Sequence, residues 1–188
     1  MGLYFIGFEQ TLQKILDSRE ERVRYQKHLL SKYCNTIISC NTIVSYKLNI
    51  PGPIKYNSLI KEVFDEGLKL FKSRLKADLI EVKFEYVVYK NSGPELFAVI
   101  NSSAFVIKEI TTRIEETHAL GRLYDYDVLD SKGRHIDRQE LNIEVRKCLI
   151  CDENAFECGR SRKHTVKELT DKIHNMAFNY FNSNMENK

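Results

Sequence analysis

The stretch Gly121-Arg122-Leu123-Tyr124-Asp125-Tyr126-Asp127-Val128 alternates large apolar and acidic side chains from Tyr124 onward. Successive side chains of a β-strand point to opposite faces of the sheet, so this alternation predicts a strand over 122–130. Tyr124, Tyr126 and Val128 would face the core, and Asp125 and Asp127 would project together from the opposite face. The turn-forming residues at 130–133 end the strand.

The two aspartates are candidates for a metal site. Carboxylate oxygens close together on one strand face are ligands that suit Mg²⁺, and two poorly solvated like charges favour a cation between them. We therefore expect Asp125 and Asp127 to be catalytic and to bind Mg²⁺. The pattern also fits two ordinary acids on a solvated strand face. Without a bound metal the two carboxylates repel each other, so we expect Asp125→Asn to leave the fold intact or slightly more stable.

Helical and extended signals alternate along the rest of the chain. Apolar residues at helical spacing predict helices over 8–33, from Asn57 or Ser58 to about 75, over 103–116 and from 165 to about 180. β-Branched and aromatic residues predict strands over 36–50, 79–90 and 96–100, the last two joined as a hairpin. Residues 146–162 are expected to be irregular. Mixed helices and strands indicate the α+β class, with a mixed or antiparallel sheet flanked by helices.

Length and composition narrow the possible classes of protein further. With 188 residues, 43% of them hydrophobic and 29% charged, the chain is expected to form a single domain over 1–188. Its core would span about 8–181, followed by a frayed polar C-terminal tail. A formal net charge of +3 does not favour a nucleic-acid partner, and no apolar run is long enough to predict a membrane span. Five cysteines without a secretory signal indicate a cytoplasmic protein with reduced thiols.

A second candidate site lies in the cysteine-rich part of the chain. Cys148 and Cys151 form a C-x2-C pair, Cys158 follows after six residues, and His164 comes shortly after it. Three thiolates and one imidazole are the ligand set of a tetrahedral structural Zn²⁺ site. We therefore expect the four side chains to converge and to be candidate ligands of a structural zinc ion. Packed free thiols or a disulfide-capable pair are the alternatives.

Basic residues gather around both candidate sites. Arginine forks and helix N-termini match phosphate oxygens, so these residues are candidates for binding a polyphosphate substrate. Lys55 belongs with them because it follows the turn Pro51-Gly52-Pro53, from which a side chain can reach a phosphate. A solvated charged face is the alternative interpretation. The candidate substrate-binding residues are Lys55, Arg122, Arg138, Arg146, Arg160 and Arg162.

Ordered motifs along nearly the whole chain resemble a known family, the citrate lyase holo-acyl-carrier-protein synthases. The motifs are Ser18-Arg19-Glu20-Glu21-Arg22, Leu48-Asn49-Ile50-Pro51-Gly52-Pro53-Ile54-Lys55, Ser92-Gly93-Pro94-Glu95, His118 to Val128, and Arg146-Lys147-Cys148-Leu149-Ile150-Cys151 with Cys158, Arg160, Arg162 and His164. Two departures, Ala119 in place of an expected Pro and Gly159 in place of an expected Ala, remove no chemical group.

The resemblance implies a phosphoribosyl-dephospho-CoA transferase with nucleotidyltransferase-type chemistry on the D-x-D strand. The donor would be 2′-(5″-triphosphoribosyl)-3′-dephospho-CoA, and the acceptor a serine of the apo citrate lyase acyl-carrier subunit. A phosphodiester would form and pyrophosphate would leave. Mg²⁺ on Asp125 and Asp127 would polarise the reacting phosphate, and arginines would neutralise the leaving group.

Three alternatives remain open from the sequence. A malonate decarboxylase carrier-protein synthase would use the same donor, although the motifs favour citrate lyase. A zinc-containing nucleic-acid module would use the cysteine cluster and the basic residues, but the chain has no base-reading motif. A non-catalytic adaptor for an acyl-carrier protein would tolerate the loss of Asp125 and Asp127, whereas an enzyme would not.

Overall fold

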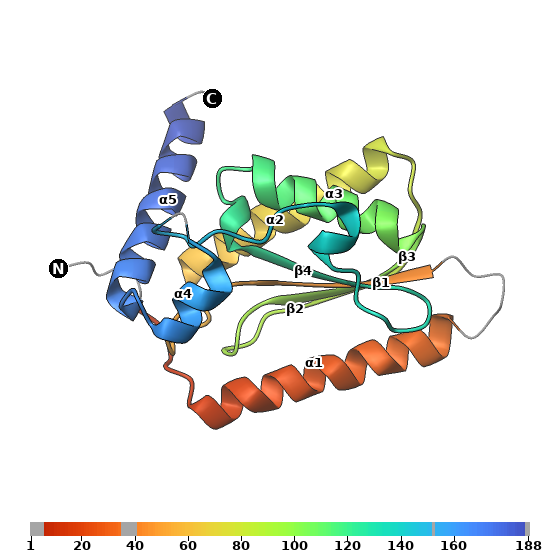
Figure 1. The fold of residues 1–188 in the computed structure, drawn as a ribbon, viewed down its shortest axis with the longest axis horizontal. Helices are drawn as coiled ribbons and strands as arrows, with labels where there is room; N and C mark the ends of the chain where they lie inside the picture. The colour runs from red at the N-terminus through yellow and green to blue at the C-terminus, as the bar shows by residue number, and fades with distance from the viewer. Residues whose placement is uncertain (1–5, 35–40, 152, 187–188) are drawn as a thin grey trace.

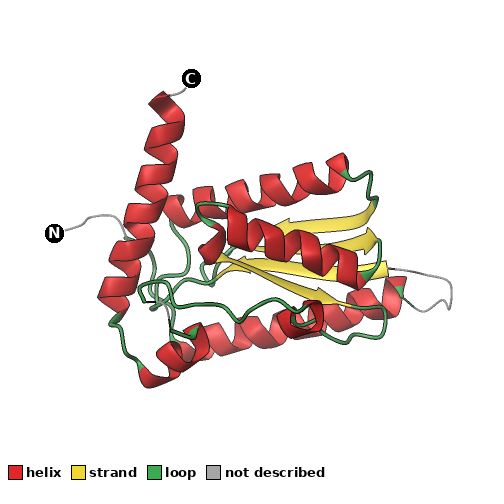
Figure 2. Cartoon of the chain, turned by 45° about the horizontal axis from the view of Figure 1, so that its top comes forward, coloured by secondary structure: helices red, strands yellow, loops and turns green. Residues whose placement is uncertain are grey.

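The computed structural model describes residues 6–34, 41–151 and 153–186 (Figures 1 and 2). Within these residues a four-stranded sheet carries helices on both faces, which confirms the α+β class. The strands are β1 (Asn41–Leu48), β2 (Val82–Val88), β3 (Glu95–Asn101) and β4 (Tyr124–Leu129). The helices are α1 (Leu12–Tyr33), α2 (Ser58–Ala77), α3 (Ala104–Thr117), α4 (Ala155–Ser161) and α5 (Val166–Glu186), with short 3-10 turns η2 (Gly121–Leu123) and η3 (Arg138–Leu141).

The sheet is antiparallel throughout, in the order β2-β3-β1-β4. The predicted hairpin of β2 and β3 is confirmed, and β4 closes the other edge by pairing with β1. A bulge between Val82 and Phe84 shifts the register of β2, so these two side chains, which were expected on one face, lie on opposite faces. The pairing places β4, with its two aspartates, at an edge where neighbouring loops can reach it.

One face of the sheet packs against α2 and α3 and holds the larger core (Figure 1). Tyr124, Tyr126 and Val128 are at most 2% exposed on this face, as the alternation predicts. Tyr46 of β1 stacks between Phe64, at 4.7 Å between ring centroids, and Tyr126, at 4.2 Å. Helix α2 comes this close because it carries Gly67, where a Cβ would lie only 2.1 Å from the Tyr46 hydroxyl.

The other face packs against α1 and holds a smaller core of Leu29, Ile43, Phe97, Val99 and Leu129. Helix α1 begins at Leu12 rather than at Phe8, because the side chain of Thr11 caps it by accepting from the Lys14 amide. Its C-terminal half covers these apolar residues. Its N-terminal half lies over polar and charged side chains of β1, β3 and β4, and a pocket opens there.

The C-terminal region departs from two expectations. Residues 146–162 are not wholly irregular, because α4 forms where the side chain of Asn154 accepts from the Phe156 amide. Helix α5 starts at the predicted Thr165–Glu168 capping box but continues to Glu186 rather than ending near 180. It lies at one end of the sheet (Figure 1), where Ile173 and Ala177 join the larger core. The predicted strand segment at 36–40 lies outside the described residues.

Among the helices that the structure describes, none combines the length and the apolar composition that crossing a lipid bilayer requires.

Candidate active site

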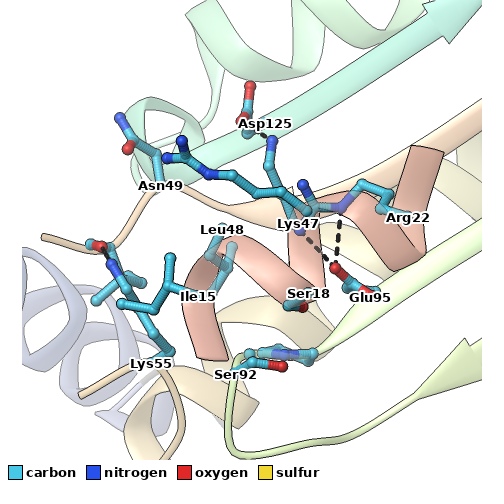
Figure 3. Close-up of a pocket in the computed structure, with 14 residues that line it drawn as sticks. Ile15, Ser18, Arg22, Lys47, Leu48, Asn49, Lys55, Ser92, Glu95 and Asp125 are labelled. Atoms are coloured by element: carbon cyan, nitrogen blue, oxygen red, sulfur yellow. Dashed lines mark hydrogen bonds and ion pairs between the residues drawn. The ribbon is translucent and has the colours of Figure 1, made fainter. Parts of the chain in front are cut away.

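The two aspartates of β4 converge on one lysine. Lys47 stands opposite Asp125 in the pairing of β1 with β4 and donates a hydrogen bond to its Oδ2 (Figure 3). The same Nζ lies 3.5 Å from Oδ2 of Asp127. Both carboxylates therefore occupy one face of the sheet, as the alternation predicts, but the cation between them belongs to the protein. Lys47 was not among the site residues predicted from sequence.

The local charges keep Asp125 ionised. Burial alone raises the pKa of its carboxyl, but the Lys47 ammonium and the Arg146 guanidinium together hold that pKa below its usual value. The side chains of Asp125 and Asp127 are 32% and 34% exposed. Two carboxylates that are partly open to solvent are a donor set that fits Mg²⁺. This ion usually keeps several waters and binds protein through one or two carboxylates.

Behind the aspartates, a buried glutamate fixes two of the predicted arginines. Glu115 of α3 is 3% exposed and accepts from Arg138 at 2.6 Å and from Arg146 at 2.5 Å. It also accepts from the Tyr126 amide, which satisfies a donor at the open edge of β4. Arg146 in turn donates to the Tyr124 carbonyl and lies 3.7 Å from Oδ1 of Asp125. Glu115 therefore holds Arg146 against the aspartates.

A polar pocket of about 340 Å³ opens beside Asp125, between α1, β1 and the turn before β3 (Figure 3). Its walls carry four basic side chains, Arg19, Arg22, Lys47 and Lys55. Of the predicted substrate-binding residues, Lys55 lies here, and its Nζ donates to the Ile50 carbonyl at 2.5 Å. Arg19, Arg22 and Lys47 were not predicted to bind substrate.

A larger pocket of about 600 Å³ opens on the other side of Asn49, which also lines the polar pocket. Arg122, Arg146 and Arg162 line it, together with the apolar side chains Pro51, Leu123, Leu149, Val166 and Leu169. Burial lowers the pKa of Arg122, and the positive charges of Arg146 and Arg138 lower it further. This wall therefore gathers positive charge beside an apolar surface. Arg160 is exposed on α4 and lines neither pocket, so it is not brought together with the other predicted arginines.

Three pockets adjoin one another, and Asp125 lines two of them. Asp125 lines the polar pocket and also a third cavity that contains Asp127, Lys108 and Arg138. Asn49 lines both the polar and the larger pocket, and Arg146 lines both the larger pocket and the third cavity. A ligand that extends from the polar pocket into the third cavity would pass the carboxylate of Asp125. A ligand that extends from the larger pocket into the third cavity would pass Arg146, which lies 3.7 Å from that carboxylate.

The cysteine cluster is assembled as the spacing predicts. One ligand atom from each of Cys148, Cys151, Cys158 and His164 lies within 4.8 Å of the others. Lys147 pairs with Asn154 across the loop that carries Cys148 and Cys151, and this pairing brings the two cysteines together. The Cys148 amide also donates to the Glu153 carbonyl at 2.7 Å. Burial opposes ionisation of Cys148, but backbone amides of Cys151 and Ile150 donate to its sulfur and lower its pKa to about 6. The donor set and its spacing fit one tetrahedral metal ion.

The fold and this site define an α+β protein in which an Asp–Lys–Arg cluster lies where cation-lined pockets meet. The family described as apo-citrate lyase phosphoribosyl-dephospho-CoA transferase matches residues 10–180, and the chain belongs to that family. The resemblance drawn from the sequence motifs is therefore confirmed.

Individual relatives agree with this assignment. Over 172 residues, 90% of this chain and 93% of the relative, the sequence is 36% identical to a probable apo-citrate lyase phosphoribosyl-dephospho-CoA transferase of Vibrio cholerae serotype O1. It is 31% identical to the enzyme of that name from Citrobacter koseri, over 85% of this chain and 84% of the relative. It is 35% identical over 97% of its length to the protein CitXG of Leuconostoc mesenteroides subsp. cremoris, of which it spans 38%.

Proposed function

We propose that this chain, acting as a single catalytic domain in the cytoplasm, transfers the 5″-phosphoribosyl-dephospho-CoA group from 2′-(5″-triphosphoribosyl)-3′-dephospho-CoA to a serine of the apo citrate lyase acyl-carrier subunit. Membership of the family supports the overall reaction. The observation that carries the proposal is that Asp125 and Lys47 line the polar pocket together, while Arg146, 3.7 Å from Asp125, lines the larger pocket, and both pockets are rich in arginine and lysine. A donor with phosphates in two places needs such an arrangement.

The reaction is a displacement at phosphorus. The acceptor serine Oγ forms a bond to the α-phosphorus of the 5″-triphosphate, and the bond from that phosphorus to the oxygen bridging to the β-phosphate breaks. Its electron pair leaves with pyrophosphate. The serine proton passes to a carboxylate oxygen. Among the described residues, Asp127 makes one ion pair, at 3.5 Å through Oδ2, whereas both oxygens of Asp125 face cations, so we assign the proton to Oδ1 of Asp127.

Two basic side chains are positioned to stabilise the developing charge. Lys47 and Arg146 already lie against Asp125, and both can donate to oxygens of a phosphate that approaches it. Glu115, which is buried, keeps Arg146 in place through an ion pair at 2.5 Å. A preorganised donor of this kind needs little rearrangement at the moment of reaction.

Asp125 and Asp127, whose carboxylates share one face of the sheet, would hold Mg²⁺. A bound Mg²⁺ would supply Lewis-acid polarisation of the phosphate and neutralise the leaving pyrophosphate.

Cys148, Cys151, Cys158 and His164 would hold a structural Zn²⁺. Three of these side chains, Cys148, Cys158 and His164, also line the larger pocket. Zinc would therefore order a wall of the proposed substrate site rather than take part in the chemistry.

The test is the intact mass of the apo acyl-carrier subunit before and after incubation with this protein, the donor and Mg²⁺. The proposal predicts a mass gain equal to one phosphoribosyl-dephospho-CoA group and release of one pyrophosphate for each subunit modified. A carrier subunit with its acceptor serine replaced by alanine is the control and should stay unmodified. An unchanged mass with the wild-type carrier subunit would contradict the proposal.

A further inference from the structure

The polar pocket between α1, β1 and the turn at 91–94 holds positive charge that the described protein does not neutralise. Two of its four basic side chains have acidic partners. Arg22 donates to Glu95 through Nε at 2.9 Å and through Nη2 at 2.5 Å, and Lys47 pairs with the two aspartates. Arg19 and Lys55, by contrast, form no ion pair with any residue that the structure describes.

These two cations lie close enough to influence each other. Burial lowers the pKa of Lys55, and the positive charge of Arg19 lowers it further. The Lys55 Nζ makes one hydrogen bond, to the Ile50 carbonyl at the pocket wall, and has two further protons to donate. Two neighbouring cations without an acid between them favour the binding of a multiply charged anion.

We propose that this pocket binds the triphosphate end of the donor, and then the departing pyrophosphate, through Arg19 and Lys55. The dephospho-CoA end lies in the larger pocket lined by Arg122 and Arg162. This assignment rests on the proposed function and adds to it the orientation of the substrate, together with Arg19 as a binding residue.

The orientation follows from the two pockets and from the bond that breaks. The α-phosphorus must lie at Asp125, which lines the polar pocket and lies 3.7 Å from Arg146 of the larger pocket. The leaving group and the group that is transferred would therefore extend into different pockets. The polar pocket is the smaller one, at about 340 Å³, and a pyrophosphate has no apolar part. The larger pocket, at about 600 Å³, combines arginines with apolar walls and suits an adenine ring, a pantetheine arm and a diphosphate.

The reverse orientation would leave these features unmatched. It would place a pantetheine arm among Arg19, Arg22 and Lys55, where burial of apolar surface gains little. The arginines of the larger pocket could hold a pyrophosphate, but Leu123, Leu149 and Leu169 would then have no apolar part of the ligand to contact. The apolar walls of the larger pocket, which the polar pocket lacks, therefore favour one direction of binding.

Titration calorimetry with two small probes tests each pocket by itself. Inorganic tripolyphosphate reports binding at the leaving-group end, and dephospho-CoA reports binding at the other end. We expect Arg19→Gln and Lys55→Met to weaken tripolyphosphate binding by about tenfold each, as loss of a charge-assisted hydrogen bond predicts. Both variants should bind dephospho-CoA as the wild type does. Arg122→Gln should show the opposite pattern, with weaker dephospho-CoA binding and unchanged tripolyphosphate binding.

The matched control is Arg24→Gln, which removes the same charge from an exposed position of α1 that lines neither pocket. It should bind both probes normally. Arg19 is exposed, so its replacement leaves folding intact even if Lys55→Met does not. Unchanged tripolyphosphate binding by Arg19→Gln, or an equal loss for both probes, would overturn the assignment. Neither probe needs the acceptor, so this failure is distinguishable from failure of the transfer, which the mass measurement reports.

Discussion

Lys47 and Asp125 stand directly opposite each other on β1 and β4, and the lysine ammonium donates to the aspartate carboxylate. Seventy-eight residues separate them in the sequence, and strand pairing alone brings them together. The pair changes the electrostatics expected from the D-x-D pattern. Repulsion between Asp125 and Asp127 is offset by Lys47 and by Arg146, so the aspartates are held by attraction to the protein's own cations.

This arrangement revises the expectation that Asp125→Asn is neutral or stabilising. The substitution leaves Lys47 and Arg146 with one fewer acidic partner in a half-buried site, so we predict a loss of about 1 kcal/mol in the free energy of unfolding. Urea unfolding of the two proteins measures it. Asp171→Asn is the control, since Asp171 pairs with Lys167 on the exposed surface of α5 and should change stability by less than about 0.5 kcal/mol. If Asp125→Asn is more stable than the wild type, repulsion between Asp125 and Asp127 outweighs the attraction of Asp125 to Lys47 and Arg146.

The same pair predicts a pH dependence. Because Lys47 and Arg146 hold the pKa of Asp125 below its ordinary value of 3.8, the ionised carboxylate stabilises the fold. That stabilisation is complete above pH 3.8 and is lost as the pH falls through the lower pKa of the folded state. The difference in unfolding free energy between wild type and Asp125→Asn should therefore shrink on acidification from about pH 7 to about pH 3. A difference that grows over this range would show that the pKa is raised instead.

Glu115 and Glu116 are adjacent on α3 and offer a matched comparison. Glu115→Gln removes the buried charge that pairs with both Arg138 and Arg146, and we predict a loss of about 3 kcal/mol in unfolding free energy. Glu116 is 48% exposed and, among the residues that the structure describes, pairs with Arg138 alone, so Glu116→Gln should cost less than about 0.5 kcal/mol. Thermal and urea unfolding of both variants measure the two values. Equal effects would mean that Glu115 does not organise the arginines.

Zinc content tests the cysteine cluster. Purified protein should contain one zinc ion per chain by elemental analysis, and chelation should lower its melting temperature. Cys151→Ser should lose the metal, because Cys151 lies within 3.2 Å of His164 and 3.9 Å of Cys158. Cys34→Ser is the control, since Cys34 is a half-buried thiol outside the cluster. Metal-free wild-type protein with an unchanged melting temperature after chelation would leave the four residues as packing side chains.

Features encoded by local spacing were predictable from the sequence. The alternation in β4 predicts which side chains enter the core and which share the other face, because a strand has a period of two wherever it pairs. The C-x2-C pair and the two residues that follow it predict their own convergence, since few residues separate them. Helix α4 was missed because seven residues are too few to show a helical period.

Features that depend on pairing across the chain were not predictable. In the sequence, Lys47 is a single lysine at the end of an apolar segment. Only the register of β1 with β4 places it at the aspartates. Glu115 reads as an acid near the end of a helix, with no sign that α3 buries it against Arg138 and Arg146. Arg19 lies in a charged segment of α1 that resembles a solvated helix face, and only the fold places it at the rim of a pocket with the turn before β3.

The most direct test of the account is the rate at which folded Asp125→Asn and Asp127→Asn proteins modify the apo acyl-carrier subunit, followed by intact mass. Thermal unfolding and circular dichroism of the same samples establish that each variant is folded, and Asp171→Asn serves as the active control. The account predicts a fall of at least ~10²-fold in rate for both variants, the size expected when electrostatic stabilisation of a transition state is lost. Modification at the wild-type rate by either folded variant would contradict it.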